Sequence, residues 1–158
     1  MTKLFIEGSE PETPRRKDAA KPADWQEREK ALDIGRSWIV EAPAGSGKTG
    51  LLIQRYLKLL GDASVEQPEQ VLAITFTVKA TGEIRERILA QLEEAAQNKP
   101  LLSDSEFERN TRTLAEAALR RDRTLGWGLL EQPRRLKIRT IDSVCAEITA
   151  SLPVLSGG

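Results

Sequence analysis

The sequence contains no histidine and only one cysteine, Cys145. Without histidine, the chain can build neither a Ser-His-Asp triad nor a histidine-ligated metal site. One cysteine excludes an internal disulfide framework and a Cys/His zinc cluster, and this usage is typical of the reducing cytoplasm. We therefore expect a cytoplasmic protein in which Cys145 is a small core residue of the last helix.

Long apolar runs are also absent. No run approaches the roughly 20 residues that a membrane-spanning helix needs, and Leu4-Phe5-Ile6 is too short for the core of a signal peptide. Hydrophobic residues make up 39% of the 158 residues and charged residues 30%. This composition predicts one soluble globular unit with a single core and no membrane partner.

An excess of charge of one sign is lacking overall, because 24 Lys and Arg balance 24 Asp and Glu. The local distribution is uneven, since the stretch from Arg109 to Arg139 holds nine basic residues and three acidic ones. This stretch is either a track for a nucleic-acid backbone or a solvated helix face. The lack of regularly interleaved aromatic residues slightly favours the helix face.

Hydrophobic periodicity predicts alternating helices and strands after a leader. Residues 1–23 hold prolines and mixed charge with little apolar material, which predicts a mobile leader. Helices are expected at 24–35, 48–60, 79–96, 104–125 and 143–152, and strands at 37–42, 71–76 and 136–141. Strand 71–76 is nearly continuous in apolar residues, as in strands buried on both faces. The order predicts an α/β fold with three layers on a short parallel sheet, and an Arg-rich helical insertion at about 98–135.

The helices also have predicted buried stripes. Those stripes are Leu52, Tyr56, Leu59 and Leu60 in 48–60, Ala80, Ile84, Ile88 and Leu92 in 79–96, and Phe107, Leu114, Ala118 and Leu125 in 104–125. Gly35 and Gly61 are expected to end their helices.

A glycine-rich run joins the first strand to the second helix. It reads Ala42-Pro43-Ala44-Gly45-Ser46-Gly47-Lys48-Thr49 and matches a P-loop at all but its first position, where Ala42 replaces glycine. Glycines there let successive amides face a polyphosphate, and the helix adds its positive end. Lys48 would reach the β- and γ-phosphates of ATP, and Thr49 would bind Mg²⁺. The plain alternative is a glycine-rich turn beside a surface lysine.

Three segments together resemble the first motifs of UvrD/RecB-like superfamily-one DNA helicases. They are Ala42 to Thr49, Ile74-Thr75-Phe76-Thr77-Val78-Lys79-Ala80, and Arg139-Thr140-Ile141-Asp142-Ser143-Val144-Cys145. The resemblance covers about residues 24–155. It implies a RecA-like ATP-binding domain of a 3′-to-5′ helicase in DNA repair and recombination, with catalytic roles for Lys48 and Thr49. Gln26 stands where the family reads adenine, and a solvated helix residue is the equal alternative.

The resemblance also implies contacts to single-stranded or partly duplex DNA. The residues it assigns to DNA are Phe76, Thr77 and Lys79 in one segment and Thr140 and Ser143 in the other. Hydroxyl and amide groups there would hold phosphates while an aromatic face stacks on a base. Phe76 as a core aromatic is the alternative. The chain departs from the family at Val78, at Thr81-Gly82 and at Asp142, where the family prefers a polar residue, alanines and histidine.

The acidic pair that hydrolysis requires is not found, because the sequence contains no Asp-Glu dipeptide. Residues 24–158 are therefore expected to be a partial ATP-binding motor domain that acts with the remainder of the motor or a partner subunit. Two alternatives stay open at this point. One is an independent small P-loop phosphotransferase or ATPase that uses Asp142 as its Mg²⁺-water ligand, and the other is an inactive truncated remnant.

Overall fold

The computed structural model describes residues 25–38 and 47–152. Within them the chain forms five α-helices, two 3-10 turns and two strands. Their order is α2 (Trp25–Ala31), α3 (Lys48–Leu60), η1 (Pro68–Gln70), β1 (Leu72–Thr75), α4 (Val78–Ala96), α5 (Glu106–Leu125), η2 (Pro133–Arg135), β2 (Lys137–Thr140) and α6 (Ile141–Ser151). The expected leader 1–23 and most of the expected strand 37–42 lie outside the described residues.

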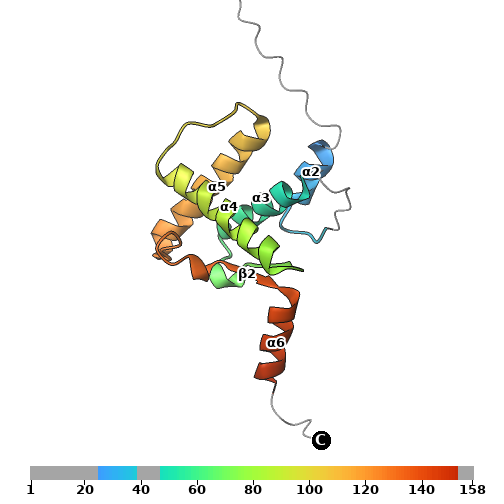
Figure 1. Ribbon diagram of the computed structural model, residues 1–158. Coiled ribbons are helices and arrows are strands. Elements are labelled where there is room, and N and C mark those ends of the chain that lie inside the picture. The colour runs from blue at the N-terminus through green and yellow to red at the C-terminus, as the bar shows by residue number, and fades with distance from the viewer. Residues whose placement is uncertain (1–24, 39–46, 153–158) are drawn as a thin grey trace, which may run out of the picture.

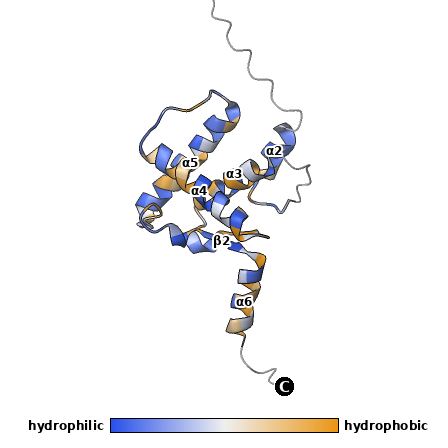
Figure 2. Ribbon diagram, in the orientation of Figure 1, coloured by the Kyte–Doolittle hydropathy of each residue, from blue (hydrophilic) through white to orange (hydrophobic). Residues whose placement is uncertain are grey.

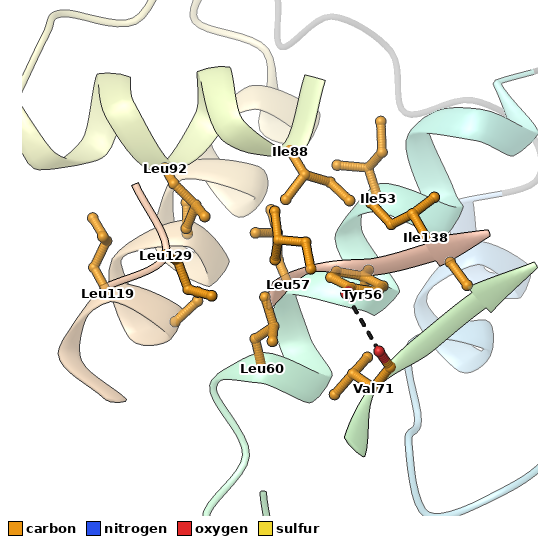
Figure 3. Packing of buried hydrophobic residues seen from close by; sticks show 14 of the residues in the cluster. Ile53, Tyr56, Leu57, Leu60, Val71, Ile88, Leu92, Leu119, Leu129 and Ile138 are labelled. Carbon is orange, nitrogen blue, oxygen red and sulfur yellow. Dashed lines mark hydrogen bonds between the residues drawn. The ribbon is translucent and has the colours of Figure 1, made fainter. Parts of the chain in front are cut away.

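The two strands lie side by side and run parallel. Leu72 pairs with Lys137, Ala73 with Ile138, and Thr75 with Thr140. The buried face of this sheet carries Ala73 and Ile138, which α3 and α4 cover (Figures 1 and 3). The α/β fold and the parallel pairing expected from the sequence are therefore present in the described part.

Side chains and glycines mark the helix ends. The hydroxyls of Thr77, Ser105 and Thr140 cap α4, α5 and α6 by accepting a hydrogen bond from the amide three residues on. At the other end of α5, Gly126 takes the left-handed conformation with φ of 67°, which favours glycine. Helix α3 ends at Gly61, as the sequence predicts, whereas α2 ends at Ala31 and not at Gly35.

The core lies between the sheet and helices α3, α4 and α5. Leu57, Ile88, Leu92 and Leu129 are fully buried there (Figure 3). Burial raises the pKa of the Tyr56 hydroxyl well above its ordinary value, so the neutral phenol donates a hydrogen bond of 3.3 Å to the carbonyl of Val71. This bond fixes α3 to the start of β1.

Helices α3 and α5 approach closely along their length. Buried Gln54 donates hydrogen bonds to the Phe107 carbonyl at 3.3 Å and to the Thr111 hydroxyl at 2.9 Å. A Cβ built on Gly50 would lie 2.8 Å from the Phe107 ring, and one on Gly61 would lie 3.3 Å from the backbone of α5. Small residues on α3 therefore allow the long α5 to pack against it.

Several expectations about burial are wrong. In β1, Leu72 and Ile74 are each 48% exposed, so the expected burial on both faces does not hold and the described part shows one covered face, not three layers. Leu52 and Leu125 are exposed, because α3 and α5 turn Ile53, Leu57, Ala115 and Leu119 inward instead. The stripe Ile84, Ile88 and Leu92 in α4 is confirmed.

Helix α6 projects away from the body of the molecule (Figure 1). None of its residues is buried, although Figure 2 shows hydrophobic residues along it. Cys145 is exposed, so its expected place in the core is wrong. Among the residues that the structure describes, no helix combines the length and apolar character that crossing a membrane requires.

Candidate nucleotide and nucleic-acid site

The described end of the glycine-rich run forms the start of α3. Gly47 precedes the helix with φ of 87° and ψ of 21°, a left-handed conformation that L side chains rarely adopt. No side chain caps this helix, and Lys48 and Thr49 are its first two residues. Both of them are exposed. The N-terminus of α3, where amides lack partners within the helix, therefore carries an exposed cation and an exposed hydroxyl, a combination suited to an anion.

The remaining residues predicted for nucleotide fall in two places. Ala42, Pro43, Ala44, Gly45 and Ser46 lie outside the described residues. Gln26 is an exposed residue of the short helix α2, and its role in base recognition stays a prediction. Helix α2 is near the turn at Gly47, because Arg28 of this helix lies against that residue.

Two arginines that contact the surroundings of α2 were missed by sequence reasoning. The Arg28 guanidinium donates to the Gly47 carbonyl at 3.5 Å. Arg55, on α3, donates to backbone carbonyls of Ala31, Asp33 and Arg36. Arg55 lies among residues that periodicity marks only as the polar side of a helix, so the sequence contains no signal for this contact.

The two segments predicted for DNA meet at one edge of the sheet. Thr75 pairs directly with Thr140, so the chain leaves both strands at the same level and enters α4 and α6 there. The Thr77 hydroxyl accepts from the Ala80 amide at 3.1 Å, and the Thr140 hydroxyl accepts from the Ser143 amide at 3.2 Å. Two helix N-termini with capping hydroxyls thus stand beside each other, and each hydroxyl keeps a hydrogen that it can donate.

A second layer of hydroxyls supports the first of these segments. Thr75 and Thr81 place their side-chain oxygens 2.6 Å apart, and each lies 3.1 Å from the Thr77 carbonyl, to which it can donate. Thr81 is buried. In the sequence, Thr81 stands out only as a departure from the family's alanines, whereas in the structure it holds the turn before α4.

The exposed side chains at this edge differ in character. Phe76 is 86% exposed, so its alternative interpretation as a core aromatic is wrong. Val78 is 80% exposed as well. Lys79 lies 3.9 Å from Glu83 in a solvent-exposed ion pair, which adds little stability. An aromatic ring and a lysine ammonium are therefore both accessible beside the capping hydroxyls.

Ser143 and Asp142 have different surroundings in α6. The Ser143 hydroxyl accepts a hydrogen bond of 2.9 Å from Arg139, which also forms an ion pair with Glu147. Asp142 is exposed in the first turn of α6 and does not end the strand. No group of three or more His, Cys, Asp or Glu residues that could hold a metal ion exists among the residues described.

Much of the Arg-rich stretch serves the fold. Arg135 donates to the Glu69 carboxylate at 2.7 Å and lowers the pKa of that group below its ordinary value. Arg112 donates to the Lys99 carbonyl at 2.6 Å, and Arg121 donates to the Val65 carbonyl. Trp127, the aromatic residue of this stretch, is buried. These contacts favour the structural interpretation over a continuous track for DNA.

A comparison with protein families decides the kinship of the chain. The family model of the UvrD/REP helicase N-terminal domain matches residues 24–156. The chain belongs to this family. The resemblance seen in the three sequence motifs is thereby confirmed, and α2 to α6 all lie within the matched part of this helicase domain.

Curated relatives of this helicase domain are much longer proteins. An ATP-dependent helicase/nuclease subunit of Alkaliphilus metalliredigens (strain QYMF) is 33% identical over 123 residues, which cover 77% of this chain and 8% of the relative. The same-named protein of Desulfitobacterium hafniense (strain DSM 10664 / DCB-2) is 42% identical over 66 residues, covering 41% of the chain and 5% of the relative. The RecB subunit of the RecBCD enzyme of Chlamydia trachomatis is 40% identical over 62 residues, covering 39% and 6%. No solved structure matches the chain.

Proposed function

We propose that this helicase domain binds ATP with Mg²⁺ at residues 42–49. The observation that carries the proposal is the left-handed Gly47 at the uncapped start of α3, followed by exposed Lys48 and Thr49. The family supports the same ligand, as does the name of the Alkaliphilus relative, which is an ATP-dependent enzyme.

The residues present fit the proposed ligands. The Lys48 ammonium would bind the β- and γ-phosphates, and the first amides of α3 would donate to the same oxygens. The Thr49 hydroxyl would ligate Mg²⁺, which when bound neutralises phosphate charge. Gly45 and Ser46 would complete the loop, and Gln26 is our candidate for the adenine edge.

We also propose that single-stranded DNA binds at the edge where β1 and β2 end. Phe76 offers a stacking face, and the capping hydroxyls of Thr77 and Thr140, with Lys79 and the Ser143 segment, offer donors for phosphates. Such contacts are indifferent to base sequence, as a translocating motor requires. In the same proposal the domain belongs to a 3′-to-5′ helicase of repair or recombination and works with further motor parts or a partner subunit.

Replacing Lys48 by alanine tests the nucleotide site. We expect Lys48→Ala to weaken binding of a fluorescent ATP analogue in Mg²⁺ by at least about tenfold, because a charge-assisted contact to phosphate is lost. Lys58→Ala, a half-buried lysine of the same helix, is the matched control and should bind as the parent does. An unchanged affinity in Lys48→Ala would remove the principal site assignment.

Replacing Phe76 by alanine tests the DNA edge. Since stacking on one base contributes about 1 to 3 kcal/mol, we expect Phe76→Ala to weaken binding of labelled oligothymidine by about tenfold. The measurement is fluorescence anisotropy at fixed salt. Leu102→Ala removes another strongly exposed apolar side chain, 91% exposed, and should leave the affinity unchanged. Equal losses in both variants would argue against a specific edge.

A further inference from the structure

We infer that Arg55 is a positioning residue, which holds α2 and the following segment on α3 and thereby keeps Arg28 against the phosphate turn at Gly47. The link to nucleotide rests on the proposed function of that turn. The positioning itself rests on contacts within this chain and can be measured without any ligand.

The Arg55 side chain binds backbone carbonyls at the end of α2 and in the segment that follows it. One guanidinium nitrogen donates to the carbonyl of Ala31 at 2.5 Å and to that of Asp33 at 3.1 Å, and the other donates to that of Arg36 at 2.9 Å. Ala31 is the last residue of α2, where carbonyls lack partners within the helix and the dipole favours a cation. A single planar guanidinium thus satisfies three carbonyls along six residues of chain, from 31 to 36.

Helices α3 and α2 differ in how firmly they are packed in the protein. Helix α3 buries Ile53, Tyr56 and Leu57 in the core, so the backbone that carries Arg55 is fixed. Helix α2 has seven residues, a length at which a helix in water is not stable by itself, and only Ala31 of it is buried. The position of α2 therefore depends on contacts such as those of Arg55. Within the segment, Trp38 adds a hydrogen bond of 3.0 Å to the Asp33 carbonyl.

Arg28 connects α2 to the phosphate turn. Its guanidinium donates to the Gly47 carbonyl at 3.5 Å, and a Cβ built on Gly47 would lie 3.0 Å from the same nitrogen. The side chain therefore packs directly on the residue that precedes α3. Because Arg55 fixes one end of α2 and Arg28 reaches the turn from the same helix, loss of Arg55 would loosen both Arg28 and Gln26 relative to the nucleotide.

Hydrogen exchange of the ligand-free protein tests the positioning directly. We expect Arg55→Gln to speed amide exchange in the peptides of residues 25–38, with exchange in α4 and α5 unchanged. Lys58→Gln, on the same helix, is the control and should leave 25–38 as in the parent. Unchanged exchange in 25–38, or a loss of protection spread over α4 and α5, would overturn the inference. If Arg55→Gln does not fold, Arg55→Lys keeps the charge with a point donor and should show an intermediate effect in the same peptides.

Binding of a fluorescent ATP analogue tests the consequence. We expect Arg55→Gln and Arg28→Gln each to weaken binding by about tenfold, the range of one lost hydrogen bond with a charged partner. The double variant should be no weaker than either single one, since both act through the position of α2. If the double variant loses affinity by the product of the two single losses, the coupling between Arg55 and Arg28 is overturned. If the proposed nucleotide site is wrong, Lys48→Ala will bind the ATP analogue as the parent protein does. The exchange experiment uses no ligand, so it still decides the role of Arg55 in that case.

Discussion

Gly50 and Gly82 both lie inside helices but have different surroundings. A Cβ added at Gly82 in α4 meets no other atom within 4 Å, whereas one added at Gly50 in α3 lies 2.8 Å from the ring of Phe107. Glycine in a helix interior costs roughly 1 kcal/mol relative to alanine. The first glycine is therefore required by packing, and the second is not.

Substituting each glycine by alanine should separate these two situations. We expect Gly82→Ala to raise the free energy of unfolding by about 0.5 to 1 kcal/mol, because it removes backbone entropy from the unfolded chain without a clash. Gly50→Ala should lack this gain or destabilise the protein by about 1 kcal/mol, since the Phe107 ring must move. Urea denaturation followed by circular dichroism measures both. An equal gain in the two variants would show that Phe107 moves aside at no cost.

Buried hydrogen bonds join helices α3 and α5. The buried amide of Gln54 joins the two helices through the Thr111 hydroxyl at 2.9 Å. Thr111 also donates to the Phe107 carbonyl at 2.7 Å. These bonds lie in the middle of α3, six residues after Lys48, so the long helix α5 supports the helix that carries Lys48 and Thr49.

Removing the Thr111 hydroxyl should weaken this contact between helices. We expect Thr111→Val to lower the free energy of unfolding by about 1 to 2 kcal/mol, because the buried Gln54 amide loses a partner. Thr113→Val, two residues on, removes an exposed hydroxyl that bonds only within α5, and should change stability by less than about 0.5 kcal/mol. Chemical denaturation of both variants provides the comparison, and equal effects would contradict a specific role for Gln54.

Element types and bounds were largely predictable from the sequence. The expected helix 48–60 is the observed α3, and 79–96 differs from α4 by one residue at its start. Glycines, capping threonines and apolar periodicity carry this information locally. Which face of β1 is buried was not predictable, because an apolar run such as 71–76 does not say whether another element covers Leu72 and Ile74.

The arrangement of the candidate site was predictable where it depends on short motifs and not where it depends on tertiary contacts. Thr77 and Thr140 stand in the two segments predicted for DNA, and their role there stays a prediction. The register that places Thr75 beside Thr140 brings those segments together. Arg28 and Arg55 are separated from their partners by 19 to 24 residues, so no local sequence pattern predicts these contacts. Thr81 acts within its segment, yet its role depends on the rotamer it adopts beside Thr75.

At the scale of the whole molecule, stability is unevenly distributed. Helices α3, α4 and α5 share one core, whereas α6 buries no residue and contacts mainly β2. We expect amides of α6 to exchange with solvent well before those of α4, because few packed contacts must break to open α6. Hydrogen exchange with mass spectrometry measures both helices in one sample. Equal protection of α6 and α4 would contradict this distribution.

The exposed position of Cys145 on α6 has a practical consequence. The chain has no second thiol, so a maleimide dye or a nitroxide would attach at this one place without any engineering. The attachment point lies five residues after Thr140, on a helix that shares no core with α3. Such a reporter would show by fluorescence or electron spin resonance whether an oligonucleotide binds at the proposed edge, while the interior that maintains the fold stays chemically untouched.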